Sequence, residues 1–317
     1  MKKKVSIGVL AYNVETYIEK ILLDLLKLKT TVYVIDDKST DKTPNILRKF
    51  KNNSEIKVIE NKKNIGAGQS TYKLISKAKN DGFDMLLKVD GDGQFIFNDI
   101  ERIYEIATDN NFKYIKSNRF WEKGIQGSMP TKRFFGNLLA TMFLQITTGT
   151  NKLFDPLNGL FTISTSIIDD IDFKHYPKRY GYPYFYSLAA IMLNYKTRQV
   201  NNTIIYGNQK SNLKSIAVLF TILKLSIIFY IKKIKFKRNI GVFQRSAFLD
   251  ILFISSLLVT ITILAQIIYT VFYANYVYIS LGNLLILLLF CLTLNILLFL
   301  SSFKEEKSIR NEFITSD

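Results

Sequence analysis

The sequence is poor in the side chains that build disulfides and soft-metal sites. Its 317 residues include one cysteine, Cys291, and one histidine, His175. One cysteine excludes a disulfide framework, and the two counts together exclude thiolate clusters and sites with several histidines. Any metal ion would therefore have oxygen ligands. The 48% hydrophobic and 22% charged residues also exclude the disordered and collagen-like classes.

Acidic residues are missing from one long central stretch. Residues 173–249 contain 14 lysines and arginines and no aspartate or glutamate, which accounts for most of the formal net charge of +17. Such a stretch needs an anionic partner. Nucleic acid would satisfy the charge, but the apolar segment that follows favours an anionic membrane surface or a lipid phosphate.

Charged residues are almost absent from two segments near the C-terminus. Residues 248–271 and 277–300 are 24 residues long each and contain one charged side chain, Asp250. As helices they would measure about 36 Å, enough to cross a hydrocarbon core of about 30 Å. The uncharged aromatic residues 272–276 between them predict a transmembrane hairpin. A buried helical hairpin of a soluble protein is the alternative.

The flanks of this hairpin predict its orientation. Basic residues lie on both sides of it, so the positive-inside tendency places both flanks and the large N-terminal region in the cytoplasm. No signal peptide is expected, because the first apolar run has only six residues. The apolar run 216–231, followed by basic residues at 232–238, predicts an interfacial helix, with a core helix of the soluble domain as the alternative.

The N-terminal part alternates short apolar runs with segments of helical periodicity. Strands are predicted at 5–10, 31–35, 56–59 and 85–89, and helices at 18–26, 43–50 and 69–79. This order predicts parallel βαβ units and therefore an α/β fold with a Rossmann-like, mostly parallel sheet. Ligands of such a sheet bind outside the carboxyl ends of its strands.

Acidic side chains collect at two of these strand ends. Asp36 and Asp37 end the second strand, while Asp90 and Asp92 end the fourth and are followed by Gln94. Carboxylates this close repel one another unless a cation offsets their charge. Two carboxylates, an amide oxygen and glycines that allow close approach suit a hard divalent cation that also binds a diphosphate.

Several motifs together resemble those of the family 2 glycosyltransferases with the GT-A fold. The similarity is greatest to polyprenyl-phosphate sugar synthases, such as the dolichyl-phosphate mannose synthases and their bacterial undecaprenyl-phosphate relatives. The motifs occur in the family's order at residues 11–13, 34–43, 64–68, 89–94, 117–120, 133 and 155–159. The resemblance covers residues 5–214 and extends to the hairpin. It implies a GT-A domain and an inverting hexosyltransferase that uses a nucleotide diphosphate sugar.

The resemblance also implies roles for individual residues. Those expected to bind the donor are Tyr12, Asp36, Asp37, Gly66 and Asp90. Those expected to hold Mg²⁺ or Mn²⁺ on its diphosphate are Asp90, Asp92 and Gln94. The expected catalytic residues are Asp92, Arg119, Arg133 and Asp155, and those expected near an acceptor phosphate are Arg133, Lys210 and Lys214. Leu10 and Val14 replace the family's usual proline and glutamate, which leaves the base of the donor undefined.

Four parts are therefore expected along the chain: a GT-A domain at 1–214, a basic interfacial segment at 215–246, two transmembrane helices within 247–303, and a cytoplasmic tail at 304–317. The predicted function is metal-dependent transfer of a sugar to a polyprenyl phosphate at the cytoplasmic leaflet, without a nucleic-acid partner and with the oligomeric state undefined. One alternative is transfer to a hydroxyl of a lipid-linked saccharide in cell-surface polysaccharide assembly, with Asp155 as the base. A non-catalytic membrane scaffold is the alternative from another class.

Gly66 and Gly68 nearly match the dinucleotide-binding fingerprint. However, the third glycine of that fingerprint is absent and six residues separate the motif from the preceding strand. The two glycines are therefore expected to form a tight loop.

Overall fold

A computed structural model of the protein describes residues 2–109, 111–120, 131–205, 215–239, 244–273, 281–310 and 314–316. The chain forms two compact units. The first consists of Met1–Ile227 together with Asn311–Asp317, and the second consists of Ile228–Arg310.

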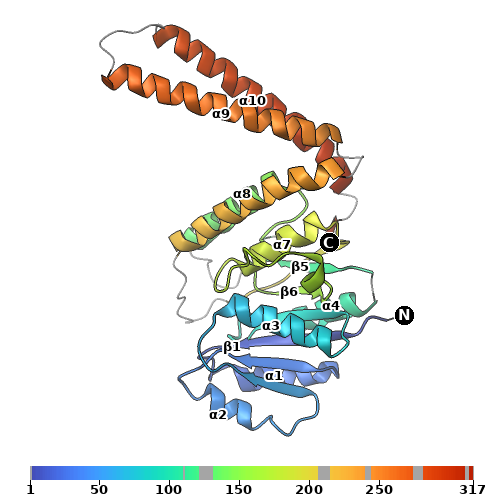
Figure 1. The fold of residues 1–317 in the computed structure, drawn as a ribbon. Helices are drawn as coiled ribbons and strands as arrows, with labels where there is room; N and C mark the ends of the chain where they lie inside the picture. Colours follow the sequence, from blue (N-terminus) through green and yellow to red (C-terminus); the bar gives the residue numbers. More distant parts are fainter. Residues whose placement is uncertain are drawn as a thin grey trace. The chain divides into compact units, whose positions relative to one another are not determined.

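The first unit is built on an eight-stranded sheet with the order β3-β2-β1-β4-β6-β5-β7-β8 (Figure 1). Its strands are β1 (Val5–Ala11), β2 (Val32–Asp36), β3 (Ile56–Glu60), β4 (Met85–Asp90), β5 (Tyr114–Asn118), β6 (Phe161–Ser164), β7 (Thr197–Asn201) and β8 (Ile314–Ser316). Strands β1 to β4 are parallel, as the sequence predicts. Strand β6 runs antiparallel between β4 and β5, which the repeating βα pattern did not predict.

The helices of the first 109 residues cover both faces of the parallel strands. They are α1 (Ile18–Leu25), the 3-10 helix η1 (Leu26–Leu28), α2 (Thr43–Arg48), α3 (Ala67–Asn80) and α4 (Phe97–Asp109). Helix α3 packs on β1, β2 and β4, and α1 packs against α4. Central strands covered on both faces have no solvent side, which explains why these strands are mostly apolar and why Ile7, Val34 and Leu87 are fully buried.

Three further helices follow the parallel half of the sheet: α5 (Thr131–Thr148), α6 (Ile167–Asp170) and α7 (Tyr182–Met192). Helix α5 packs against α7. One face of α5 is nevertheless exposed and apolar, with side chains between 39% and 57% exposed at Phe134, Phe135, Leu138, Leu139 and Met142. Their spacing of i, i+1, i+4, i+5 and i+8 places them on one stripe of the helix.

Helix α8 (Ser215–Asn239) has apolar side chains on two faces. Val218, Ile222 and Leu225 are buried, whereas Phe220 is 67% and Ile227 61% exposed. The buried face agrees with the core helix and the exposed apolar face agrees with the interfacial helix, the two alternatives expected for this segment. The helix ends at residue 239, and residues 240–243 of the expected segment lie outside the described residues.

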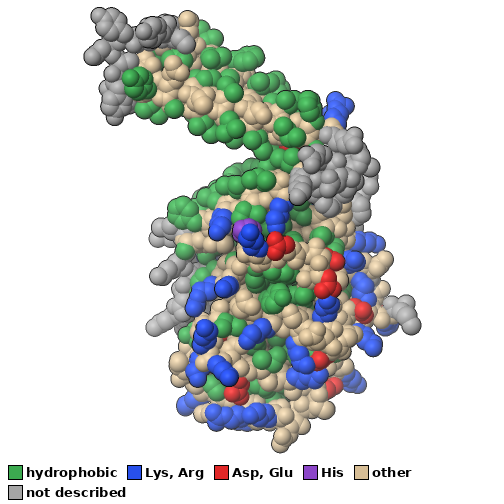
Figure 2. Space-filling view, viewed as in Figure 1, with side chains coloured by type: hydrophobic (Ala, Val, Ile, Leu, Met, Phe, Trp, Pro, Cys, Tyr) green, Lys and Arg blue, Asp and Glu red, His purple; other side chains and the backbone are tan. Residues whose placement is uncertain are grey.

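The second unit contains a hairpin of two long helices, α9 (Gln244–Tyr273) and α10 (Leu281–Arg310). Among the described residues, 245–271 and 281–307 are long and apolar enough to cross a membrane, with mean hydropathies of 2.5 and 2.8. In the most apolar part of each helix only 11% and 17% of the residues are buried. This exposure argues against the buried hairpin of a soluble protein, and Figure 2 shows hydrophobic side chains over the surface of both helices.

Both helices extend beyond the predicted spans. Helix α9 begins four residues before 248, and α10 runs to Arg310, ten residues past 300. Its described part begins at 281, and residues 274–280 lie outside the described residues. Most of the expected tail is therefore ordered, because 304–310 continue α10 and β8 pairs in parallel with β7.

Four charged side chains are buried together at the base of this hairpin. The ammonium of Lys233 on α8 donates to the carboxylate of Glu306 at 3.0 Å, and the Nε of Arg310 donates to the same carboxylate at 2.7 Å. Asp250 accepts hydrogen bonds from the Tyr230 and Ser302 hydroxyls at 2.9 and 2.6 Å. Asp250, the one charged residue expected within the spans, thus belongs to a cluster of two cations and two anions that joins α8, α9 and α10.

Candidate active site

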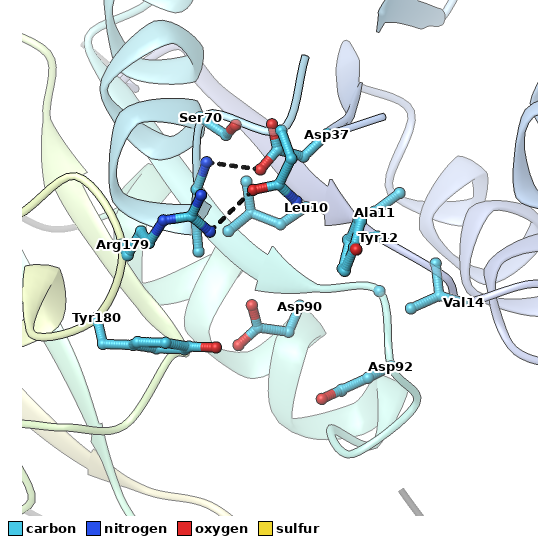
Figure 3. A pocket seen from close by; sticks show the side chains of 14 residues that line it. Leu10, Ala11, Tyr12, Val14, Asp37, Ser70, Asp90, Asp92, Arg179 and Tyr180 are labelled. Atoms are coloured by element: carbon cyan, nitrogen blue, oxygen red, sulfur yellow. Dashed lines mark hydrogen bonds between the residues drawn. The ribbon is translucent and has the colours of Figure 1, made fainter. Parts of the chain in front are cut away.

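A pocket opens at the carboxyl ends of β1, β2 and β4, where the parallel sheet is expected to bind ligands. It is lined by Leu10, Ala11, Tyr12, Val14, Asp37, Asn64, Gly66, Ala67, Ser70, Asp90, Gly91, Asp92, Arg179 and Tyr180 (Figure 3). The predicted site residues Tyr12, Asp37, Gly66, Asp90 and Asp92 are among them. Asp36 and Gln94 are not.

Asp90 and Asp92 project into the pocket from the end of β4 (Figure 3). Asp90 forms an ion pair with the ammonium of Lys88, a fully buried side chain on the same strand. Burial and the neighbouring charge of Asp90 raise the pKa of Asp92 to about 6. Ionisation of Asp92 is therefore harder than in water, and a cation beside the two carboxylates would favour it.

The donor set of this pocket fits a hard divalent cation. In the described part of the chain no three histidine, cysteine, aspartate or glutamate side chains form a metal-binding group. The pair Asp90 and Asp92 would thus supply two carboxylates, and the other ligand positions would go to substrate phosphate oxygens and water. The backbone amide of Gln94 donates to Asp92 Oδ1 at 3.1 Å, so Gln94 orients this aspartate.

The two acidic residues at the end of β2, Asp36 and Asp37, hold loops of the protein. Asp36 Oδ1 accepts hydrogen bonds from the backbone and side chain of Ser39 at 3.0 and 2.5 Å. Asp37 Oδ2 accepts from the Gly66 amide at 2.8 Å, and Asp37 Oδ1 accepts from the Ile65 amide and the Asn61 side chain, both at 2.9 Å. Asp37 therefore fixes the wall of the pocket formed by residues 64–66, while Tyr12 stays 44% exposed at its mouth.

Arg119 and Asp155 form a bidentate ion pair next to the ends of β5 and β6. The Arg119 Nε donates to Asp155 Oδ2 at 2.6 Å and its Nη2 donates to Oδ1 at 2.5 Å. The Asp155 side chain is fully buried and that of Arg119 is 11% exposed. The Phe120 ring meets the Phe134 ring of α5 edge to face at 5.9 Å, and Arg133, which precedes Phe134, is half-buried.

Two lysines that the sequence analysis did not select lie beneath these carboxylates. Lys88 and Lys116 are completely buried on β4 and β5, and burial lowers the pKa of Lys116 to about 7. Lys116 donates to the Asn158 carbonyl oxygen. A Cβ at Gly159 would overlap Asp90 Oδ2, so the loop 155–159 packs directly on the proposed metal ligand.

Arg179 and Tyr180 also line the pocket and were not predicted. Their signal in the sequence is weak, because they lie in an irregular segment far from every motif. Lys88 gave a readable signal, because the other residues of the predicted strand 85–89 are apolar, whereas the strand that carries Lys116 was not predicted. Lys210 and Lys214 lie outside the described residues, so their expected place near an acceptor phosphate stays a prediction.

Comparisons with known proteins give one family and related structures. The model of the family described as glycosyl transferase family 2 matches residues 6–172. An uncharacterized protein of Methanocaldococcus jannaschii is 29% identical over 167 residues, covering 51% of this chain and 72% of that protein. A UDP-N-acetylglucosamine–dolichyl-phosphate N-acetylglucosaminyltransferase of Methanococcus voltae is 24% identical over 184 residues, covering 54% and 73%.

Among solved structures, glucosyl-3-phosphoglycerate synthase from Mycobacterium tuberculosis has a similar fold. Its complex with UDP superposes with a TM-score of 0.55 at 16% identity, over 71% of this chain and 80% of that chain. Its complex with Mn²⁺, UDP-glucose and phosphoglyceric acid gives a TM-score of 0.51 at 18% identity, with the same coverage. At these identities the likeness shows the GT-A fold.

Proposed function

Since the chain belongs to glycosyl transferase family 2 and is a glycosyltransferase, we propose that it transfers a sugar from a nucleotide diphosphate sugar to a polyprenyl phosphate. The observation that carries this proposal is the acidic pocket at the ends of β1, β2 and β4, with Asp90 and Asp92 projecting into it. A non-catalytic scaffold would have no use for such a pocket, and family membership argues against that alternative.

The charge of the pocket supports a metal-bound diphosphate as its ligand. Burial and the charge of the neighbouring Asp90 both raise the pKa of Asp92, so the two carboxylates are costly to keep ionised side by side. A bound Mg²⁺ or Mn²⁺ would offset this repulsion and stabilise the negative charge that develops on the leaving diphosphate. Glucosyl-3-phosphoglycerate synthase, which has a similar fold, has been crystallised with UDP together with Mn²⁺ or Mg²⁺, which agrees with this assignment.

The surroundings of Asp155 favour a phosphate acceptor over a hydroxyl acceptor. A hydroxyl must lose a proton as it attacks the sugar, and Asp155 was the candidate base. Both of its oxygens accept hydrogen bonds from Arg119 inside the protein. A phosphate oxygen is already anionic, so it attacks C1 of the sugar without a base while the bond from C1 to the diphosphate breaks and its electron pair leaves with the nucleotide.

The exposed stripe of α5 supports a lipid as the carrier of that phosphate. Arg133 lies in the first turn of α5, and the next two turns expose Phe134, Phe135, Leu138 and Leu139. A cation followed by an apolar surface suits a phosphate head group attached to a hydrocarbon chain. The Methanococcus voltae relative, whose name includes a dolichyl-phosphate acceptor, agrees with this assignment.

The two apolar helices α9 and α10 support attachment to a membrane, and the proposed orientation places the first unit on the cytoplasmic side. The chain leaves the first unit at residue 227 and returns to it at residue 311, so both ends of the hairpin join the same unit. Two spans bring the chain back to the side from which it started, and the basic residues 232–238 favour the cytoplasmic side.

Membranes that contain the protein, incubated with labelled nucleotide sugars, test the proposal. With undecaprenyl phosphate added, we expect a labelled glycolipid that mild acid cleaves, because a sugar attached to a phosphate is acid-labile. A label that appears only on an added lipid-linked saccharide, in an acid-stable linkage, would support the hydroxyl alternative.

A further inference from the structure

A short segment of the chain, residues 177–180, crosses the beginning of α3 and forms one wall of the pocket. We refer to it as the strap. The backbone amides of Gly68 and Gln69 donate to the carbonyl oxygens of Arg179 and Lys178 at 3.1 and 2.8 Å. These amides belong to the first turn of α3, which has no partners for them within the helix. The strap therefore occupies the helix end that a dinucleotide-binding fold would offer to a phosphate.

The two glycines of the loop 64–68 make room for the strap. A Cβ at Gly68 would overlap the carbonyl oxygen of Pro177, and one at Gly66 would lie 2.7 Å from the carbonyl oxygen of Lys178. Gly66 also has a φ of 91°, a conformation that other residues rarely adopt. The glycine pattern that resembles a nucleotide fingerprint thus has another physical cause, the close approach of this chain's own backbone.

The strap places the side chain of Arg179 in the pocket. Its Nη1 donates to Asn64 Oδ1 at 3.0 Å, on the same side of the pocket as Asp37 (Figure 3). Asp90 and Asp92 lie on the other side, with the hydroxyl of Tyr180 directed toward Asp90 (Figure 3). Among the described residues that line the pocket, Arg179 is the one cationic side chain.

This arrangement indicates which part of a bound nucleotide Arg179 would contact. If the diphosphate of the donor lies at Asp90 and Asp92, as the proposed function requires, the nucleoside extends toward Asp37 and Arg179. A guanidinium offers five N–H donors and no acceptor, so its partner on the nucleoside must be an acceptor atom. The ribose oxygens are shared by all donors, so only acceptors on the base can discriminate. Uracil, thymine, cytosine and guanine carry a carbonyl oxygen on the base, whereas adenine offers ring nitrogens alone.

We propose that Arg179 determines the base specificity of the donor by donating hydrogen bonds to a carbonyl oxygen of the nucleobase. The strap and the paired glycines are the device that positions this arginine. The inference rests on the proposed function, and it adds that donors with a carbonyl-bearing base are selected over adenine donors.

Isothermal titration of the full-length protein in detergent with Mg²⁺ tests the inference. The ligands are UDP, GDP, ADP and inorganic pyrophosphate, and the proteins are the wild type, Arg179→Gln, Arg179→Lys and Lys178→Gln. The last variant removes a neighbouring exposed charge that does not line the pocket. A hydrogen bond from a charged donor contributes about 1.5–3 kcal/mol, or about 10- to 100-fold in affinity.

We expect the wild type to bind UDP or GDP more tightly than ADP. Arg179→Gln should weaken the preferred nucleotide at least about tenfold, leave pyrophosphate and ADP unchanged, and thereby remove the discrimination between bases. Lys178→Gln should behave as the wild type, and Arg179→Lys should restore part of the loss. Since Arg179 is exposed, unfolding temperatures should agree among all four proteins.

Three results would overturn the inference. Unchanged affinity of Arg179→Gln for the preferred nucleotide would show that Arg179 does not bind the base of the donor. An equal loss for pyrophosphate would assign the arginine to the phosphates. A wild type that binds none of the three nucleotides would overturn the proposed function as well, whereas tight wild-type binding with an unaffected variant would leave that function standing.

Discussion

Arg119 holds the buried carboxylate of Asp155 in a two-point contact, with the Nε and Nη2 hydrogens donated to separate carboxylate oxygens at 2.6 and 2.5 Å. The backbone amide of Arg119 donates to Asp155 Oδ2 as well, at 3.1 Å. Asp155 adopts a left-handed backbone conformation, with a φ of 50°. The pair therefore fixes the loop 155–159 and aims the guanidinium, and Asp155 has no oxygen without a partner to take a proton.

The first prediction separates the two acceptor readings through Asp155→Asn and Arg133→Ala. With undecaprenyl phosphate, Asp155→Asn should lower kcat by about 10- to 100-fold through a misplaced Arg119, with an unchanged shape of the pH–rate profile. Arg133→Ala should raise the KM for the lipid phosphate at least about tenfold, because a charged hydrogen bond is lost. Steady-state kinetics between pH 5 and 9 measure both effects.

The hydroxyl reading predicts a different pattern for the same two variants. Asp155→Asn would then lose the contribution of a general base, about 10²- to 10⁴-fold, together with the acidic limb of the profile. Arg133→Ala would be nearly normal. Circular dichroism of both variants provides the control for folding.

The second prediction concerns the metal. Asp92→Asn keeps the size of the side chain but removes one of the two carboxylates in the pocket, so turnover should fall by at least about 10³-fold. EDTA should abolish the activity of the wild type, and added Mg²⁺ or Mn²⁺ should restore it. Binding of Mn²⁺, followed by electron paramagnetic resonance, should be lost in the variant even without substrate. Full activity in EDTA would contradict the metal assignment.

The third prediction is the pH dependence of this binding. Burial and Asp90 raise the pKa of Asp92 to about 6, and a metal ion binds the ionised carboxylate. Protons should therefore compete below pH 6, where the Kd for Mn²⁺ should rise about tenfold per pH unit, and the Kd should be constant above it.

The same raised pKa has a consequence for stability without metal. A carboxyl whose pKa is higher in the folded state stabilises the protein below the unfolded pKa of about 3.9 and loses this contribution as the pH rises through 6. In EDTA, Asp92→Asn should therefore unfold at a higher temperature than the wild type above pH 6. Near pH 4 the unfolding temperatures of the two proteins should become equal. Thermal unfolding across this range measures the difference, and a less stable variant at pH 8 would contradict the account.

The parallel half of the fold was predictable because local signals agree with tertiary structure there. Short apolar runs alternate with amphipathic helices through residue 90, and Asp36, Asp37, Asp90 and Asp92 mark the strand ends directly. None of the strands after β4 was predicted, neither β5 and β7 nor the antiparallel β6 and the C-terminal β8, since pairing between distant segments leaves no periodic signal. Strand β8 pairs with β7 across more than a hundred intervening residues.

The candidate site was predictable only where its residues fall within motifs. Tyr12, Asp37 and the aspartates after β4 were found in this way. Arg179 was missed, because its place depends on the strap crossing α3. The tight loop expected at Gly66 and Gly68 does not by itself indicate which segment approaches it. The intramolecular partners of Asp36, Asp37 and Asp155 were also not readable, because a sequence shows which groups can pair but not which do.

The fourth prediction concerns the buried charges at the base of the hairpin. Glu306 is 1% exposed and accepts from both Lys233 and Arg310. Glu306→Gln would leave these cations without full compensation, which costs about 3–5 kcal/mol for a broken buried pair. Glu305→Gln is the matched control, because Glu305 pairs with Arg245, whose side chain is 84% exposed, and such pairs contribute at most about 1 kcal/mol.

Thermal unfolding of the purified protein in detergent compares these variants. Glu306→Gln should lower the unfolding temperature clearly more than Glu305→Gln. Equal shifts would show that the cluster does not stabilise the packing of α8 on the hairpin.

The fifth prediction concerns topology. Reporters fused before Met1 and after Asp317 should both report the cytoplasm, and a tag inserted at residue 275 should react with an impermeant reagent from outside. Opposite locations of the two terminal reporters would mean that one of the apolar helices does not span the membrane.

The mass of the product formed by the purified protein tests the transfer of a sugar to a polyprenyl phosphate most directly. The wild type in lipid nanodiscs is incubated with Mg²⁺, undecaprenyl phosphate and nucleotide diphosphate sugars tested one at a time, with Asp92→Asn as the control. For one donor, the wild type should form undecaprenyl phosphate carrying one sugar residue and release one nucleoside diphosphate per glycolipid, while the control forms none. Undecaprenyl phosphate that stays unmodified with every donor, while a lipid-linked saccharide gains a sugar, would contradict the account.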